Sequence, residues 1–173
     1  MTRSVLAATA IAALILGGCS GSPGGPTINN KLNPEPAASP GAPSGASSVI
    51  SADILAREPV ANTAVVKHIL ISWHDLADAM GGHLDPRAEK RSKADAEAEV
   101  RSLLKQLQDG ADFDAVMKAN SEDTSSAMSG RSFTVTPDAQ LVIEFRQLSL
   151  RLKVGEIGVC QSDFGFHIIK RIA

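Results

Sequence analysis

The chain has 173 residues, 43% of them apolar and 21% charged, with a formal net charge of −2. This length suits one ordinary domain with additional segments, and the near-neutral charge, with only 3% aromatic residues, argues against a nucleic-acid partner. Two cysteines are too few for the disulfide framework that stabilises small secreted domains.

Residues 1–18 have the features of a signal peptide. Arg3 precedes an apolar run from Val5 to Leu16, and a helix of that length would rise about 18 Å, well short of a bilayer core of roughly 30 Å. The run ends in Leu16-Gly17-Gly18-Cys19, which resembles a bacterial lipobox and implies cleavage before Cys19 and attachment of lipid to it. The alternative is an ordinary secretory signal with an incidental cysteine.

The lipobox resemblance implies a location as well as a membrane anchor. Several acyl chains on Cys19 would hold the chain at a membrane, because each buried methylene contributes about 0.8 kcal/mol. Ser20, and not an acidic residue, follows Cys19. By the sorting habit of lipoproteins this implies the outer membrane of a Gram-negative-type cell envelope, on the side that faces the periplasm.

Residues 19–59 are predicted to be a lipidated N-terminus followed by a disordered linker. From Ser20 to Ser48 the sequence consists mainly of Ser, Pro, Gly and Ala, with Lys31 and Glu35 as its only charges. Such a segment cannot bury enough apolar surface to offset the entropy lost on ordering. It is expected to act as a spacer between the membrane and a folded domain over residues 60–173.

The first half of that domain predicts one strand and two helices. Residues 64–72 are apolar and rich in β-branched side chains, as in a buried strand, and residues 73–91 are typical of a long polar loop. Ser92 begins a helix with Asp95 as its capping-box partner, and Gly110 lies where that helix should end. A second helix is predicted to follow directly, capped by the side chain at position 112.

The second half predicts a loop, a short strand, a helical stretch and a hairpin. Residues 121–130 are mostly small and predict the loop, residues 133–135 the strand, and residues 136–152 a helix in pieces. Residues 157–162 and 166–172 are then expected to pair around a tight turn. The order of elements predicts an α+β domain, with a four-stranded antiparallel sheet packed with three to four helices.

Four short motifs occur in order within this domain. They are Lys67-His68-Ile69-Leu70-Ile71; Gly110-Ala111-Asp112-Phe113, followed by Asn120-Ser121-Glu122-Asp123; Val154-Gly155-Glu156-Ile157; and Phe164-Gly165-Phe166-His167-Ile168-Ile169-Lys170. Together they resemble the parvulin family of peptidyl-prolyl cis/trans isomerases, from Lys67 to Ile172. The resemblance implies the parvulin fold and an isomerase that needs no cofactor.

The implied reaction is rotation about the peptide bond that precedes proline, which faces a barrier of about 18–20 kcal/mol. Twisting the amide removes its resonance, so that the nitrogen becomes more basic and the carbonyl less polar. A dry apolar pocket that grips the proline ring, with polar groups around the carbonyl, would therefore favour the twisted state over the planar one.

The resemblance assigns two sets of residues to these roles. The polar cluster would consist of His68, Asp123, Ser162 and His167, and the apolar cup of Phe133, Leu141 and Phe145. The cluster could instead be a buried polar network that only fixes the sheet, and each cup residue could be ordinary core. A metal site that also used Cys160 is a further alternative, but these residues lack the short spacing of metal ligands, so no metal is expected.

The sequence departs from the family pattern in three places. Many relatives carry Gly-Gly-Asp-Leu-Gly where this chain has Gly130-Arg131-Ser132-Phe133-Thr134, and Thr136 replaces a common aromatic residue. The strand before Ser162 is also one residue shorter than expected. Replacing these glycines reduces the freedom of the backbone, which puts the expected catalytic efficiency in question. The predicted fold is unchanged.

Phosphate-dependent relatives carry a basic cluster in the loop after the first strand. Here three cations in that loop are accompanied by four anions, which argues against a phosphate-specific site; the residues are Arg87, Lys90 and Arg91, with Asp75, Asp78, Asp85 and Glu89.

Three hypotheses for function follow. The first is a membrane-tethered isomerase that acts on Xaa-Pro bonds of exported or unfolded proteins, with its membrane contact through lipidated Cys19. The second is a chaperone-like module that binds proline-containing segments without useful turnover. The third is a lipoprotein whose parvulin fold serves only for docking. Truncation of Phe145 should abolish turnover in the first case and leave partner capture unchanged in the third.

Overall fold

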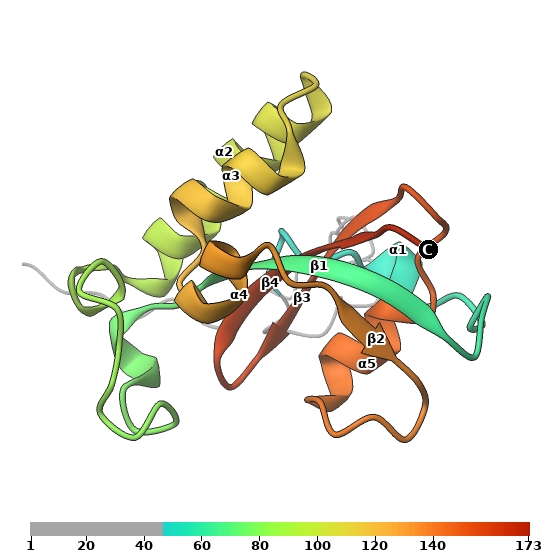
Figure 1. The fold of residues 1–173 in the computed structure, drawn as a ribbon. Coiled ribbons are helices and arrows are strands. Elements are labelled where there is room, and N and C mark those ends of the chain that lie inside the picture. The colour runs from blue at the N-terminus through green and yellow to red at the C-terminus, as the bar shows by residue number, and fades with distance from the viewer. Residues whose placement is uncertain (1–46) are drawn as a thin grey trace, which may run out of the picture. The chain divides into compact units, whose positions relative to one another are not determined.

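A computed structural model describes residues 47–173, so the predicted signal peptide, Cys19 and most of the predicted linker lie outside the described residues. The centre of the fold is a four-stranded sheet with the strand order β2-β1-β4-β3 and antiparallel neighbours throughout (Figure 1). The strands are β1 (Ala64–Ile71), β2 (Phe133–Val135), β3 (Ile157–Ser162) and β4 (Gly165–Arg171). Both predicted central features, the first strand and the C-terminal hairpin, are confirmed.

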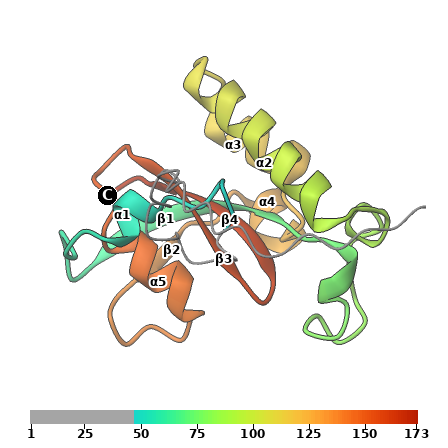
Figure 2. The ribbon, with the colours of Figure 1, turned by 180° about the vertical axis from the view of Figure 1, so that it is seen from behind.

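Helices cover both faces of this sheet (Figures 1 and 2). One face carries α2 (Lys93–Gln108) and α3 (Phe113–Asn120), and the other carries α1 (Ala52–Leu55) and α5 (Ile143–Ser149). A further short helix, α4 (Thr124–Ser129), connects α3 to β2. The loop after β1 contains two single turns of 3₁₀ helix, His74–Leu76 and Ala88–Lys90. The α+β fold class is therefore confirmed.

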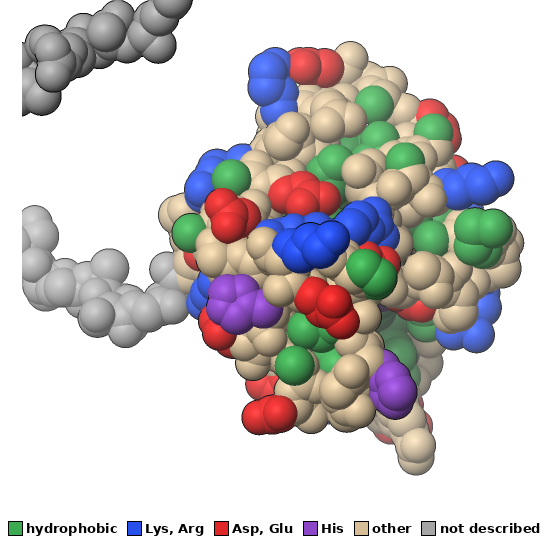
Figure 3. Space-filling model, turned by 90° about the vertical axis from the view of Figure 1, so that its left-hand side faces the viewer, with side chains coloured by type: hydrophobic (Ala, Val, Ile, Leu, Met, Phe, Trp, Pro, Cys, Tyr) green, Lys and Arg blue, Asp and Glu red, His purple; other side chains and the backbone are tan. Residues whose placement is uncertain are grey.

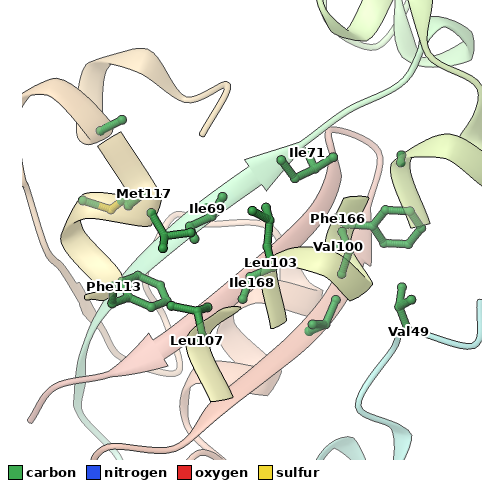
Figure 4. Packing of buried hydrophobic residues seen from close by; sticks show 14 of the residues in the cluster. Val49, Ile69, Ile71, Val100, Leu103, Leu107, Phe113, Met117, Phe166 and Ile168 are labelled. Carbon is green, nitrogen blue, oxygen red and sulfur yellow. The ribbon is translucent and has the colours of Figure 1, made fainter. Parts of the chain in front are cut away.

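The α2 and α3 face is filled by large apolar side chains (Figure 4). Alternate residues of each strand point to this face, so β1 contributes Ile69 and Ile71 while β4 contributes Phe166 and Ile168. They pack against the apolar stripe of α2, including Leu103, which is 2% exposed. This layer is a continuous apolar core.

The predicted caps of the two long helices are confirmed. The Ser92 hydroxyl accepts from the Asp95 N–H at 3.2 Å, and the Asp95 carboxylate accepts in return from the Ser92 N–H at 3.1 Å. Asp112 caps α3 by accepting from the Ala115 N–H at 2.8 Å. Satisfying the free N–H groups of the first turn fixes where each helix begins.

Two predicted boundaries are wrong. The stretch 121–130, predicted as a loop, contains α4, which begins after Asp123 and ends at Gly130. The helix predicted from Thr136 begins only at Ile143, because residues 136–142 form a turn instead.

None of the helices between residues 47 and 173 combines the length and the hydrophobicity that spanning a bilayer requires.

The folded region also begins before residue 60, where the sequence placed the end of the linker. Val49 and Ile54 are buried, one in the apolar cluster on each face of the sheet. Between them, the Ser51 N–H donates to the Val159 carbonyl and the Val159 N–H donates to the Ser51 hydroxyl, each at 2.9 Å. Residues just before α1 therefore pair with the outer edge of β3.

Candidate active site

The polar residues predicted for the site lie on the sheet face opposite α2 and α3. In the β1–β4 register Leu70 is opposite His167, and in the β3–β4 register Ser162 is opposite Gly165. His68, His167 and Ser162 are thus diagonal neighbours across three strands, which brings their side chains within reach of one another. Antiparallel pairing of β1 with β4 explains how residues 99 positions apart in sequence meet.

These side chains form one continuous chain of hydrogen bonds. The Ser162 Oγ lies 2.8 Å from His167 Nε2, and His167 Nδ1 lies 3.3 Å from His68 Nδ1. At the other end, His68 Nε2 lies 2.9 Å from the Oδ2 of Asp123. The structure therefore brings together all four residues predicted for the cluster.

The direction of each proton in this chain follows from its ends. The Asp123 carboxylate can only accept, so His68 donates to it from Nε2; when the His68 ring is neutral, its Nδ1 is the acceptor toward His167. His167 then donates from Nδ1, and its Nε2 accepts the hydroxyl proton of Ser162. Burial, together with the neighbouring His68, lowers the pKa of His167 to about 3, so that this imidazole is neutral at physiological pH.

Asp123 is held by more than the histidine. Its carboxylate accepts from the hydroxyls of Ser125 at 2.9 Å and Ser126 at 2.7 Å, and it caps α4 through the Ser126 N–H. The hydrogen bond from His68, followed by those from the serines, lowers the pKa of Asp123 well below its ordinary value. Neither serine was predicted for the site, although an Asp followed by small polar residues is a recognisable helix start.

The predicted cup residues line one hollow beside this chain. The hollow has a volume of about 570 Å³ and is bordered by His68, Asp123 and His167 on its polar side. Six of its ten lining residues are apolar; these are Leu70, Phe133, Leu141, Val142, Phe145 and Phe164. The structure thus places Phe133, Leu141 and Phe145 together and adds three apolar neighbours outside the predicted cup.

Aromatic edges fix the geometry of the cup. The His68 ring meets the rings of Phe133 and Phe145 edge to face, each with centroids 5.2 Å apart. Phe145 also meets His167 edge to face at 5.5 Å. Phe145 is 3% exposed and therefore belongs to the core and to the cup at once, whereas Phe133 is half-buried. These contacts couple the shape of the apolar cup to the orientation of the two histidines.

Phe164 lies at the rim because the turn between β3 and β4 is held against the end of β1. The Ser72 hydroxyl donates to the Phe164 carbonyl at 2.6 Å, and the Phe164 N–H donates to Ser162 Oγ at 3.1 Å. Gly165 has φ 135°, and a Cβ there would lie 2.5 Å from the Ile71 carbonyl oxygen, so only glycine fits. This turn therefore carries both a rim residue and a member of the polar chain.

Two of the three cations of the loop after β1, Arg87 and Arg91, are paired with anions. Arg87 contacts Asp85 at 2.9 Å, and the mostly buried Arg91 contacts Glu122 at 2.8 Å. Burial raises the pKa of Glu122, even though Arg91 and the Ser72 N–H oppose that effect. Figure 3 views the molecule from the side of this loop, where both signs of charge are intermixed. The loop offers no concentrated positive surface among the described residues.

Cys160 is buried next to the site, opposite His167 in the register of β3 and β4. Burial raises the pKa of its thiol to about 12, so it stays protonated and does not act as a thiolate ligand or nucleophile. Among residues 47–173, no three His, Cys, Asp or Glu side chains converge in the manner of a metal site.

Comparison with known proteins agrees with this geometry. A family model described as the PPIC-type PPIase domain matches residues 52–172. The chaperone SurA of Saccharophagus degradans is 30% identical over 115 residues, which are 66% of this chain and 24% of the relative. The foldase protein PrsA of Exiguobacterium sibiricum is 37% identical over 76 residues, which are 43% of this chain and 25% of the relative.

The fold itself recurs in solved structures. The solution structure of TbPIN1 matches with a TM-score of 0.56 and 21% identity, over 66% of this chain and all of that one. The peptidyl-prolyl isomerase ESS1 from Candida albicans matches with a TM-score of 0.55 and 18% identity, over 65% of this chain and 63% of that one.

The chain belongs to the PPIC-type peptidyl-prolyl isomerase family, the parvulins, because the family model spans most of its length. The match covers about a quarter of the SurA and PrsA relatives, so it concerns a part of those proteins and not those proteins as a whole.

Proposed function

We propose that the chain catalyses cis/trans isomerisation of Xaa-Pro bonds in unfolded or exported proteins, without forming a covalent intermediate. The observation that carries the proposal is the apolar hollow bordered by His68, His167 and Asp123, with Ser162 hydrogen-bonded to His167. A hollow of about 570 Å³ is large enough for a proline ring together with the peptide groups on either side of it.

The cup would act by removing the amide from water. The planar amide is the more polar state, and water stabilises it by hydrogen bonding to its carbonyl. Phe133, Leu141 and Phe145 offer the proline ring an apolar surface and offer the carbonyl little compensation for lost water. Transfer into the cup therefore disfavours the planar amide more than the twisted one.

The polar chain would add an electrostatic contribution. Its negative charge is the carboxylate of Asp123, whose pKa is lowered by the hydrogen bond from His68, and His167 is held neutral by burial. A negative charge and acceptor groups beside the hollow oppose the partial negative charge on the carbonyl oxygen of the planar amide. Because that charge decreases as the amide twists, the field lowers the barrier to rotation. The hydrogen bonds from the serines fix Asp123, so the field needs little reorganisation.

A chaperone-like role is the second candidate, and one observation favours it. The segment that normally carries several glycines here reads Arg131-Ser132-Phe133-Thr134, so its backbone is stiffer than in many relatives. A stiffer wall would bind a proline segment in one conformation and release it slowly. The names of the relatives, a chaperone and a foldase, are compatible with either role.

The direct test of catalysis is NMR exchange spectroscopy on a short unphosphorylated Xaa-Pro peptide with the full-length chain in detergent micelles. The wild type should accelerate exchange between the cis and trans peptide signals. Leu141→Ala should reduce the acceleration at least tenfold, since it removes half-buried apolar surface from the cup. Val154→Ala is the matched control, because Val154 is exposed before β3 and lies outside the cup. An inactive wild type that still binds the peptide would favour the chaperone-like role.

We also infer that lipid on Cys19 tethers the domain to the outer membrane of a Gram-negative-type cell envelope, facing the periplasm. The support is the lipobox-like sequence and the Ser/Pro/Gly/Ala-rich stretch that follows it. Metabolic labelling with a palmitate analogue should mark the wild type and leave Cys19→Ser unlabelled. Label on both proteins, or on neither, would contradict the anchor.

A further inference from the structure

Arg131 lies next to the cup without lining it, because it stacks on Phe133, which does line the hollow. Gly130 ends α4 in the left-handed conformation, with φ 66°, and the Arg131 N–H then donates to the Ser126 carbonyl at 3.2 Å. This turn directs the Arg131 side chain back over Phe133, and the guanidinium carbon lies 4.7 Å from the centre of the ring. Because Phe133 lines the hollow, its ring is shared between the cup and a stacked cation.

The guanidinium of Arg131 has no polar partner of its own in the described part of the chain. Every other arginine between residues 47 and 173 makes a side-chain hydrogen bond or an ion pair. Asp123, the acidic residue that borders the hollow, already accepts from His68, Ser125 and Ser126. Arg131 is therefore exposed and held by stacking alone, with its N–H donors available.

A stacked guanidinium is well suited to one kind of ligand. Stacking uses the flat face of the group and leaves the N–H donors along its edge free, in the plane that a carboxylate needs for two parallel hydrogen bonds. The ring of Phe133 also restricts the side chain, so less conformational entropy is lost when a ligand binds.

We propose that Arg131 binds the carboxylate of an acidic side chain next to the proline held in the cup. The proposal rests on the proposed function of the cup, and it specifies the substrate class as proline segments with Asp or Glu beside the proline. The guanidinium of Arg131, stacked on the lining residue Phe133, and the carboxylate of the lining residue Asp123 are then opposite charges at two points of the hollow, which would orient the peptide.

The test compares peptides that carry Glu, Gln or Lys immediately before or after the proline. Affinity and cis/trans exchange are both measured by NMR with the full-length chain. Wild type should bind one of the Glu peptides about five-fold more tightly than its Gln counterpart, and should bind the Lys peptide least. Added salt should reduce the preference, because the ion pair is exposed.

Arg131→Gln should abolish the preference for Glu, and Arg131→Lys should keep only part of it, since an ammonium lacks the planar pair of donors. Arg101→Gln is the matched control: it removes the same charge from α2, on the opposite side of the sheet, and should leave the preference intact.

Each outcome decides between the two proposals. Acceleration of exchange with no Glu preference in wild type, or with the same preference in Arg131→Gln, overturns the role of Arg131 and leaves the isomerase intact. A preference that depends on Arg131 in a protein that accelerates nothing supports the role of Arg131 and rejects catalysis. Failure to bind any of the peptides overturns both.

Discussion

The two faces of the sheet are built from the same strands but differ in what they bury. The face under α2 and α3 is continuously apolar, with Ile69, Phe166 and Ile168 packed against the helices. On the other face the apolar cluster formed with α1 and α5 adjoins a buried line of polar side chains and an open hollow. The face under α2 and α3 therefore contributes mainly to stability. The opposite face is packed less completely, because it contains the candidate active site.

This division predicts that truncating a side chain on the helix-covered face will affect folding most. Leu103→Ala should lower the free energy of unfolding by about 2–5 kcal/mol, since it leaves a cavity in a fully packed layer. Leu104→Ala, at the next position, should lower it less, because Leu104 is only partly buried against the same cluster. Denaturant titration measures both. Equal losses of unfolding free energy in the two variants would contradict the contrast between the fully buried and the partly buried position of α2.

Acid should destabilise the protein because His167 is buried in its neutral form on the sheet face that carries the candidate site. The pKa of His167 is lowered to about 3 in the folded state, mainly by burial, and returns to about 6.5 when the chain unfolds. Below pH 6.5 the unfolded state therefore binds a proton that the folded state does not, and the free energy of unfolding should fall steadily from pH 6.5 towards pH 4. Above pH 6.5 this contribution is constant.

Urea titrations between pH 4.5 and 7.5 would measure this dependence. His167→Gln should have a flatter profile than wild type, because the titrating group is gone. His83→Gln, at an exposed position on the loop after β1, is the control and should run parallel to wild type. Parallel profiles for wild type and His167→Gln would show that the acid sensitivity arises elsewhere.

Phe133→Ala should separate activity from stability. Phe133 is half-buried and lines the hollow, so its removal should reduce kcat/KM by at least tenfold and affect unfolding less than Leu103→Ala does. Peptide exchange measured alongside denaturant titration distinguishes the two effects. A large loss of stability with unchanged kcat/KM would mean that Phe133 is a core residue only.

Asp123→Asn is a smaller change that tests the electrostatic part of the mechanism. Asparagine can still cap α4, so the fold should be retained, while loss of the negative charge should lower kcat about five-fold with little change in KM. Asp112→Asn makes the same substitution at the cap of α3, away from the hollow, and should leave kcat unchanged. Similar kinetics for both variants would argue against a role for the charge of Asp123.

The sequence predicted well those elements whose signals are local. The β-branched run of β1, the capping box at Ser92 and the cap at Asp112 each depend on neighbouring residues, and all three are present. His68 and His167 could be assigned to one site because the family resemblance supplied a long-range pairing that single-strand patterns do not contain.

Other features depend on tertiary contacts and could not be predicted in this way. Residues 47–55 look like the end of a linker, yet Val49 and Ile54 are buried because the segment pairs with the edge of β3. The helix α4 has no apolar stripe, and its only local signal is the capping side chain of Asp123. The stacking of Arg131 on Phe133 depends on the left-handed turn at Gly130, which sequence spacing does not specify.

The most direct test of the account is one NMR sample that contains the methyl-labelled full-length chain and a proline peptide. The account predicts exchange cross-peaks between the cis and trans forms of the peptide, together with methyl shifts at Leu70, Leu141 and Val142 around the hollow. The methyl groups of Val100 and Leu103, beneath α2, should stay unchanged. Shifts confined to the α2 face, or exchange that continues unaltered when Phe133 is replaced by alanine, would contradict the assignment of the hollow as the active site.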